Sequence, residues 1–393
     1  MNFFDDIHSS LDYIDKIEAY PIFRVVKGRI EPEAIVDNKN VLIFCSNNYL
    51  GLSAKQEVIE AANEATRIYG TGAGGSRVLS GNLEIHTLLE KKIAYFKKKE
   101  DAIIFSTGFQ TGLGVIPALT GVFNLPGSTN VTHKTIVFSD ASNHASLIDG
   151  CRLAQIKIEI YKHVDTHDLE ERLKKYGSEV RKLIVTDGVF SMDGDLAPLD
   201  KIVPIARRHK AAILLDDAHG TGVLGSNGRG TAEFFGVEKE VDIIMGTFSK
   251  ALGAVGGFLS ADKELIKYLR IACRSYMLSA GLPASVAATV IKALEIIQLN
   301  KELIIKVQEN AKYLRGQLEQ LGYDTLNSQS AIVPILIGDE NEAYGVANFL
   351  MANGIYAPAV RWPAVEKNKA IIRFTVMATH TKEHIDALVN VCR

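Results

Sequence analysis

Gly246-Thr-Phe-Ser-Lys-Ala-Leu-Gly-Ala-Val-Gly-Gly257 is the stretch around which the rest of the sequence is organised. The preceding residues, 241–245, are mostly apolar and β-branched, a pattern that predicts a short buried strand. Lys250 is therefore expected just past the C-terminal end of a strand, where open α/β sheets bind their ligands. With Thr247, Ser249 and close glycines, it could hold a phosphate or form a Schiff base. Such a lysine can also be merely solvated, so the choice depends on the other residues.

The composition is that of an ordinary globular protein. The chain has 393 residues, 47% of them hydrophobic and 23% charged, with a formal net charge of -2, and it is long enough for two domains. Nucleic-acid and membrane-surface partners are not expected, because both favour a basic excess. A cytoplasmic protein is expected, since the N-terminus lacks a signal-peptide pattern and no apolar stretch is long enough to span a bilayer.

The four cysteines form neither a metal-binding nor a disulfide pattern. They lie far apart and without CxxC spacing, at Cys45, Cys151, Cys273 and Cys392. We therefore expect reduced thiols and no metal site.

Helical and strand patterns alternate from about residue 53 to residue 280. This alternation predicts an α/β fold whose large domain has a mainly parallel central sheet with helices on both faces. Strands are expected at 102–105, 135–139, 156–160, 182–186, 211–215, 241–245 and 256–259. A long helical pattern follows over 283–320. After it, strands are expected at 331–337, 355–359 and 370–376, and helices near 341–353 and 381–391. This mixture indicates a smaller C-terminal α+β domain. The expected division is an N-terminal segment over 1–46, a large domain over 47–281 and a small domain over 282–393.

Two glycine patterns, at 70–75 and 220–225, match the GxGxxG fingerprint of dinucleotide-binding folds. The first follows a helical pattern, where the fingerprint requires a strand. In the second, residues 216–219 separate the strand from the glycines. Neither pattern predicts a dinucleotide site.

Chemically useful residues follow five of the predicted strands, whose C-terminal ends meet at one edge of a parallel sheet. They are the turn 106–112, His144, Asp187, Asp216 with His219, and Lys250. The turn opens a helix, so its free N–H groups favour an anion. Each residue alone could be a helix cap or a buried polar group. Together, an anion site, a lysine, an aromatic ring and a carboxylate meet the needs of pyridoxal 5'-phosphate.

The order and spacing of these motifs resemble those of the α-oxoamine synthase family of fold-type I pyridoxal-phosphate enzymes. The resemblance extends from Ser46-Asn-Asn-Tyr-Leu-Gly51 to Arg373 and includes residues 74–77, 143–146, 186–194, 216–222 and 247–250. It implies a homodimer with shared active sites. It also implies condensation of a small amino acid with an acyl-CoA thioester to give an α-amino ketone, CoA and carbon dioxide.

The resemblance leaves the substrate pair open. Residues 186–194 and 216–222 are most similar to members that join alanine to pimeloyl-CoA in biotin biosynthesis. Residues 20–24 and 81–86 are instead similar to bacterial members that acylate serine with a palmitoyl group, and glycine acetylation is a further alternative. Arg361-Trp-Pro lacks a second proline, and 121–132 resembles an insertion. An aminotransferase, a lyase and an inactive regulatory homologue are remoter alternatives.

The resemblance also implies roles for residues around the cofactor. Lys250 would form the Schiff base and move the Cα proton, and Asp216 would pair with the pyridinium nitrogen. His219 and Ser191 would bond to the ring hydroxyl, and His144 would stack on the ring and polarise the reacting carbonyl.

Further implied roles concern the phosphate and the substrate. Gly108, Phe109, Thr247 and Ser249 would hold the phosphate, with Ser279 as the candidate residue from the neighbouring subunit. Asn47 and Arg373 would bind the amino-acid carboxylate, Asp187 would line the site, and Arg24 would contact substrate.

Overall fold

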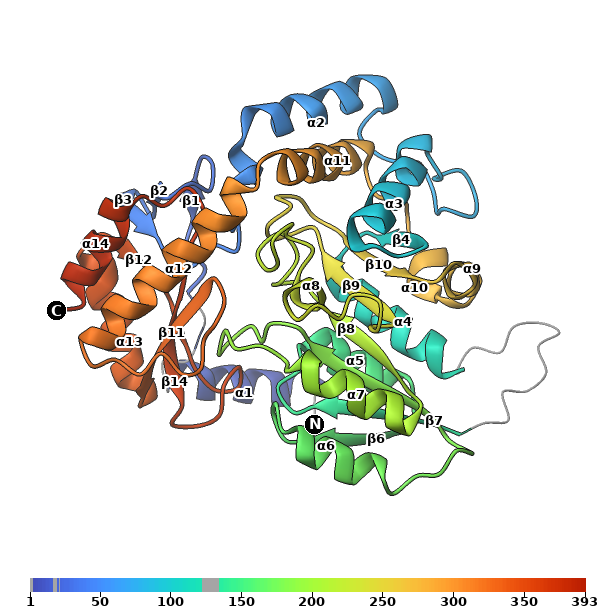
Figure 1. Cartoon of the computed structure of the whole chain (residues 1–393). Coiled ribbons are helices and arrows are strands. Elements are labelled where there is room, and N and C mark those ends of the chain that lie inside the picture. Colours follow the sequence, from blue (N-terminus) through green and yellow to red (C-terminus); the bar gives the residue numbers. More distant parts are fainter. Residues whose placement is uncertain (1–2, 17–19, 21, 122–133) are drawn as a thin grey trace.

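The computed structural model describes residues 3–16, 20, 22–121 and 134–393 (Figure 1). Apart from Gly121, the apparent insertion over 121–132 lies outside the described residues. No helix in the described ranges is both long and apolar enough to cross a membrane.

A seven-stranded sheet forms the centre of the larger part of the molecule, in the order β4-β10-β9-β8-β7-β5-β6. Neighbours in the run β9-β8-β7-β5-β6 are parallel, whereas β10 is antiparallel to both β4 and β9. The prediction of a mainly parallel sheet is thus confirmed. The strands are β4 Asp101–Phe105, β5 Thr135–Asp140, β6 Lys157–Tyr161, β7 Arg181–Asp187, β8 Ala211–Asp216, β9 Ile243–Thr247 and β10 Gly257–Ala261.

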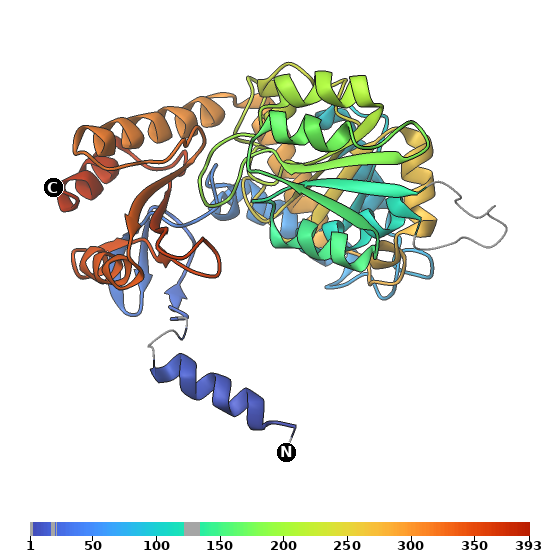
Figure 2. The ribbon, with the colours of Figure 1, turned by 90° about the horizontal axis from the view of Figure 1, so that it is seen from below.

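Helices cover both faces of this sheet, as Figure 2 shows. Because side chains alternate across a strand, Val137 packs on one face and Phe138 on the other. The Val137 face is covered by α4 Gly108–Thr120, α5 Ala145–Leu153 and α9 Lys263–Ala272. The Phe138 face is covered by α6 Thr166–Leu173 and α7 Leu199–His209. Buried apolar faces on both sides explain why the strands are nearly uniform runs of apolar residues.

Strands of the N-terminal segment and a strand from the C-terminal part of the chain form one sheet. The sequence did not indicate this pairing. β1 Val26–Lys27, β2 Glu33–Val36 and β3 Lys39–Ile43 form an antiparallel meander, and β12 Ile355–Tyr356 pairs in parallel with β3. Val36, Val41 and Ile43 pack on Met351. The meander alone could not bury these side chains, so it associates with a distant segment.

A second small sheet contains β11 Ile332–Gly338, β14 Ala370–Thr375 and β13 Ala359–Val360, all antiparallel. It packs with the long helix α12 Glu302–Gln320, and the remaining helices of this region are α13 Glu340–Ala352 and α14 Lys382–Val391. These elements match the expected α+β pattern, except that the strand expected over 355–359 is two short strands, β12 and β13, which belong to different sheets.

The helical stretch expected over 283–320 is two helices, because Asn300 leaves helical geometry at φ -126 and ψ 83. Its side-chain oxygen accepts a hydrogen bond from the N–H of Glu302, the first residue of α12, at 3.2 Å. The preceding helix, α11 Ala284–Leu299, lies along α2 Gln56–Tyr69 and α3 Glu84–Lys97 (Figure 1). This packing associates α11 with the larger part of the molecule, so a division near Asn300 is a better proposal than the one at 281/282.

Four further elements complete the described structure. They are α1 Asp5–Lys16, the 3-10 turn η1 Leu52–Ala54, α8 Thr231–Phe234 and α10 Arg274–Met277. Helix α1 has no buried residue and projects from the body in Figure 2.

Candidate active site

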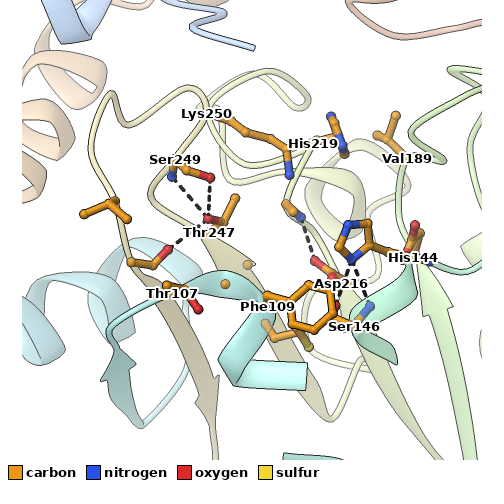
Figure 3. A pocket seen from close by; sticks show the side chains of 17 residues that line it. Thr107, Phe109, His144, Ser146, Val189, Asp216, His219, Thr247, Ser249 and Lys250 are labelled. Carbon is orange, nitrogen blue, oxygen red and sulfur yellow. Dashed lines mark hydrogen bonds between the residues drawn. The ribbon is translucent and has the colours of Figure 1, made fainter. Parts of the chain in front are cut away.

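A cavity of about 260 Å³ lies at the C-terminal edge of the central sheet (Figure 3). Its lining comes from the segments that follow β4, β5, β7, β8 and β9. The structure thereby brings together nine of the predicted site residues: Gly108, Phe109, His144, Asp187, Asp216, His219, Thr247, Ser249 and Lys250.

One end of the cavity is the N-terminus of α4. Thr107 caps this helix, because its hydroxyl accepts a hydrogen bond from the Gln110 N–H at 3.0 Å. The first N–H groups of a helix lack intrahelical partners. The Thr247 and Ser249 hydroxyls are 2.8 Å apart beside it. A Cβ on Gly108 would lie 2.8 Å from the Thr247 side chain, so glycine permits this close approach. Free N–H groups, a helix dipole and two hydroxyls form a cradle suited to a phosphate.

Lys250 follows β9 and points into the cavity toward His219 and Asp216 (Figure 3). Burial lowers the pKa of its amine, although the charges of Asp216 and Asp187 oppose this shift. A lowered pKa increases the fraction of neutral amine, which is the form that attacks a carbonyl.

Asp187 and Asp216 end adjacent strands in register with one another. Burial raises the pKa of Asp216, whereas the charge of Lys250 opposes the shift. Burial and the neighbouring charge of Asp216 raise the pKa of Asp187 well above its usual range. Two like charges so close cannot both be stable, so we assign the negative charge to Asp216, which faces the lysine, and a proton to Asp187.

His144 caps α5, and its Nδ1 accepts a hydrogen bond from the Ser146 N–H at 3.2 Å. Burial lowers the pKa of the ring. A neutral ring whose Nδ1 is an acceptor has its proton on Nε2. Its centroid is 6.0 Å from that of Phe109 in an edge-to-face contact.

A buried hydrogen-bonded series links His219 to Arg373. Nδ1 of His219 is 2.7 Å from the Tyr49 hydroxyl, which donates to Oδ1 of Asn47 at 3.2 Å. Both terminal nitrogens of Arg373 reach the same Asn47 oxygen, at 3.5 and 3.4 Å, and its Nε donates to the Ser191 carbonyl. The predicted pair Asn47 and Arg373 is thus connected to His219 through Tyr49.

Tyr49 was missed as a functional residue. It lies within the motif 46–51, and an aromatic residue in a polar segment was the available signal. No local pattern indicates that it would meet His219, 170 residues later.

Three other predicted residues are placed differently. Ser191 meets Arg373 through its backbone carbonyl. The Ser279 hydroxyl accepts from Gln110 Nε2 and lines a different, smaller hollow. Arg24 pairs with Asp37 at 2.9 Å and lines a hollow of about 360 Å³ with Tyr344 and Trp362. None of them lines the cavity of Lys250, so their roles stay predictions.

Over residues 39–391 the chain matches the family described as aminotransferase class I and II. An 8-amino-7-oxononanoate synthase from Thermoanaerobacter pseudethanolicus is 41% identical over 384 residues, which cover 98% of this chain and 94% of the relative. A serine palmitoyltransferase from Sphingobacterium spiritivorum is 43% identical over 371 residues, 94% of this chain and 90% of the relative. Among solved structures, a serine palmitoyltransferase from S. paucimobilis with a bound PLP–myriocin aldimine is 33% identical with a TM-score of 0.91, covering 99% of this chain and 96% of that one.

Proposed function

The chain belongs to the aminotransferase class I and II family, and from this premise we propose that it is a pyridoxal 5'-phosphate-dependent C-acyltransferase. The enzyme condenses a small amino acid with an acyl-CoA thioester, giving an α-amino ketone, CoA and carbon dioxide. Alanine and pimeloyl-CoA are the favoured pair, because relatives named 8-amino-7-oxononanoate synthase match across nearly the whole chain at about 40% identity.

The single observation that supports this function best is the placement of Lys250 opposite Asp216, with the phosphate cradle of α4 beside them. The cofactor fits these residues. A phosphate suits the N–H groups and hydroxyls at Gly108, Thr247 and Ser249, and a cationic ring nitrogen would neutralise the buried Asp216 carboxylate. When bound, pyridoxal phosphate supplies an electron sink for negative charge at the substrate Cα.

Each residue then contributes binding, orientation or proton movement. Asp216 would keep a proton on the ring nitrogen, and the flat ring of His144 would supply a stacking surface for the cofactor. Lys250 would hold the cofactor, and its amine, whose pKa is lowered by burial, would accept the Cα proton of the substrate. His144 donates from Nε2 to the carbonyl oxygen of the thioester.

Arg373 and Asn47 bind the carboxylate of the amino acid. A guanidinium offers two parallel N–H donors that match the two carboxylate oxygens, and Asn47 can donate from its amide nitrogen. Because the same carboxylate later leaves as carbon dioxide, its orientation relative to the cofactor also affects that step.

A homodimer in the cytoplasm is part of the proposal. The loops 74–82 and 278–281 lie together through the Ser76–Ala280 bridge. They expose apolar side chains there, namely Val78, Leu79 and Leu278, with Leu79 82% exposed. A cluster of this kind is typical of a subunit interface, and symmetric dimers are the commonest oligomers. Sedimentation at assay concentration tests it, since an active monomer would contradict the dimer.

The second candidate is serine palmitoyltransferase-like activity, which the relative from Sphingobacterium spiritivorum favours. A substrate matrix separates the candidates: alanine, serine or glycine, each with pimeloyl-, palmitoyl- or acetyl-CoA, with CoA release measured by a thiol reagent. We expect release only when both substrates are present, fastest with alanine and pimeloyl-CoA. Faster turnover of serine with palmitoyl-CoA would favour the second candidate, and amino-acid turnover without any thioester would contradict acyl transfer.

A further inference from the structure

His163 lies between two buried carboxylates and outside the lining of the cavity of Lys250. It follows β6, and its Nδ1 is 2.9 Å from Oδ1 of Asp140 while its Nε2 is 3.1 Å from Oδ2 of Asp195. The ring stands edge-to-face on Phe190, with 4.4 Å between centroids. Both ring nitrogens therefore face acceptors, and only the charged imidazolium has two N–H groups to donate.

The charge balance agrees with this protonation. Asp140 and Asp195 are 2% and 6% exposed, so uncompensated charges there would be costly. Burial alone would lower the pKa of His163, but the hydrogen bonds to the two carboxylates outweigh it and raise the pKa to about 10. The ring is thus a cation at neutral pH and joins the two acids.

Asp140 shapes the first of two turns that reach the proposed active site. Its Oδ1 accepts from the Ser142 N–H at 2.8 Å, and its backbone carbonyl accepts from the Asn143 N–H at 3.3 Å. Its Oδ2 accepts from the Val164 N–H at 2.9 Å, beside His163 itself. This turn leads directly into His144.

Asp195 closes the second turn, residues 190–195. Its carbonyl accepts from the Phe190 N–H at 3.1 Å, and the Phe190 carbonyl accepts from the Gly194 N–H at 2.9 Å. Gly194 has φ +71, and a Cβ there would lie 2.4 Å from the Ile332 carbonyl oxygen, so the turn fits tightly against β11. Inside this turn, the Ser191 carbonyl accepts from Nε of Arg373.

We propose that His163, as an imidazolium joining Asp140 to Asp195, is a positioning residue that fixes the turn 190–195 and thereby orients Arg373 for the substrate carboxylate. The inference rests on the proposed function, because it needs Arg373 to bind an amino acid. The Ser191 carbonyl holds one side of the guanidinium, so the terminal nitrogens stay directed toward Asn47. A turn released from His163 would let this carbonyl move and the guanidinium rotate.

The rival explanation of the cluster is a divalent metal ion, since ligand atoms of His163, Asp193 and Asp195 lie within 4.8 Å of one another. A metal would need Nε2 of His163 without a proton, whereas the 3.1 Å distance to Asp195 fits a hydrogen bond. Dialysis against EDTA should leave alanine binding unchanged. If EDTA weakened alanine binding and added Zn²⁺ or Mn²⁺ restored it, a metal ion rather than an imidazolium would join the acids. That result would overturn the proposal.

The main test is His163→Gln in the cofactor-loaded enzyme, because a glutamine amide is neutral and carries both N–H groups on one nitrogen, so it cannot replace donors at both Nδ1 and Nε2. Alanine binding is followed by the change in cofactor absorbance without any acyl-CoA. We expect the alanine Kd to rise about tenfold, the effect of a poorly placed charged hydrogen bond, with the cofactor Kd changed less than about twofold. The control is His209→Gln. His209 is the last residue of α7, and its Nε2 lies 3.5 Å from Oε1 of Glu170, so this variant should bind alanine like the wild type.

A double-mutant cycle distinguishes positioning from a general loss of structure. If His163 acts through Arg373, His163→Gln should add less than about twofold to the alanine Kd of Arg373→Lys. Fully additive effects, or equal losses of alanine and cofactor affinity, would overturn the proposal.

Amide hydrogen exchange adds a readout that needs no substrate. The Phe190 and Gly194 amides should exchange about tenfold faster in His163→Gln than in the wild type, because their turn opens more often. Unchanged exchange would overturn the inference whatever the enzyme's substrate. If the wild type responded to no amino acid but His163→Gln still increased exchange in the turn 190–195, the proposed function would be rejected and the role of His163 in fixing this turn would be retained.

Discussion

The hydroxyl oxygen of Tyr49 lies 2.7 Å from Nδ1 of His219. Tyr49 is 1% exposed and donates its own proton to Asn47, so Nδ1 of His219 must be the donor to the tyrosine oxygen. Burial lowers the pKa of His219 well below its usual range, which keeps the ring neutral. With its proton on Nδ1, the histidine has a free acceptor at Nε2 for a cofactor hydroxyl.

Tyr49→Phe should therefore lower cofactor affinity and kcat, each by about fivefold at most, since one buried hydrogen bond contributes about 1 kcal/mol. The phenyl ring fills nearly the same space, so the urea midpoint should change little. Cofactor titration by fluorescence and steady-state rates measure the two effects. Wild-type cofactor affinity and kcat in Tyr49→Phe would show that Tyr49 does not set the protonation of His219.

Lys250→Ala should retain the fold, bind the cofactor without a covalent link and release no CoA. Borohydride reduction followed by peptide mapping checks the linkage, because the reduced bond survives proteolysis. The control is Lys267→Ala, an exposed position on α9 where labelling should be as in the wild type. A label that moves to another lysine without loss of activity would contradict the assignment of Lys250.

Asp216→Asn and Asp187→Asn should differ strongly although the two residues end adjacent strands. Asparagine resembles a protonated aspartate, which is the form that burial and the Asp216 charge favour at Asp187. At Asp216 the substitution removes the charge that pairs with the ring nitrogen, and we expect kcat to fall by about 100-fold or more, near 3 kcal/mol. For Asp187→Asn a loss below about fivefold is expected. Equal losses in kcat would show that the charge is not localised on Asp216.

Much of the central sheet and its edge is predictable from the sequence because those signals are local. Short β-branched and apolar runs such as 183–185 favour strands buried on both faces, and the residues after them then meet at one edge. That reasoning places His144, Asp216 and Lys250 together before any coordinates are known.

The features that the sequence did not predict depend on contacts between distant segments. The pairing of β3 with β12 joins residues near 42 and 355, and Tyr49 meets His219, with no pattern in either segment that specifies the other. The break at Asn300 was hidden because apolar residues continue at helical spacing on both sides. His163 resembled any partly exposed histidine until Asp140 and Asp195 were seen on its two sides.

His380 should make the fold sensitive to acid. Its Nδ1 accepts from the Met377 N–H at 2.8 Å, its Nε2 faces the Ile43 carbonyl at 3.0 Å, and burial lowers its pKa from 6.5 to about 4. Between those two pH values the unfolded chain binds a proton that the folded chain does not. Stability from this group is therefore complete above pH 6.5 and is lost as the pH falls toward 4, by about 3 kcal/mol.

The measurement is urea unfolding at several pH values across that window, in the wild type and in His380→Asn. Asparagine can still accept from the Met377 N–H but does not titrate. The variant should be less stable at pH 7, yet lose less stability on acidification. Parallel stability curves would show that His380 is not the group responsible.

Arg373→Lys tests the carboxylate site most directly. The guanidinium makes two kinds of contact at once, with Nε on the Ser191 carbonyl and the terminal nitrogens toward Asn47. An ammonium group is a single point and cannot keep both contacts while it also binds two carboxylate oxygens. We expect the amino-acid KM to rise at least tenfold, about 1.4 kcal/mol, with cofactor binding unchanged. Arg208→Lys, exposed on α7, is the matched control and should keep the wild-type KM. If Arg373→Lys also kept the wild-type KM, the carboxylate would have to bind at other residues, and the link from Asn47 through Tyr49 to His219 would then serve the cofactor alone.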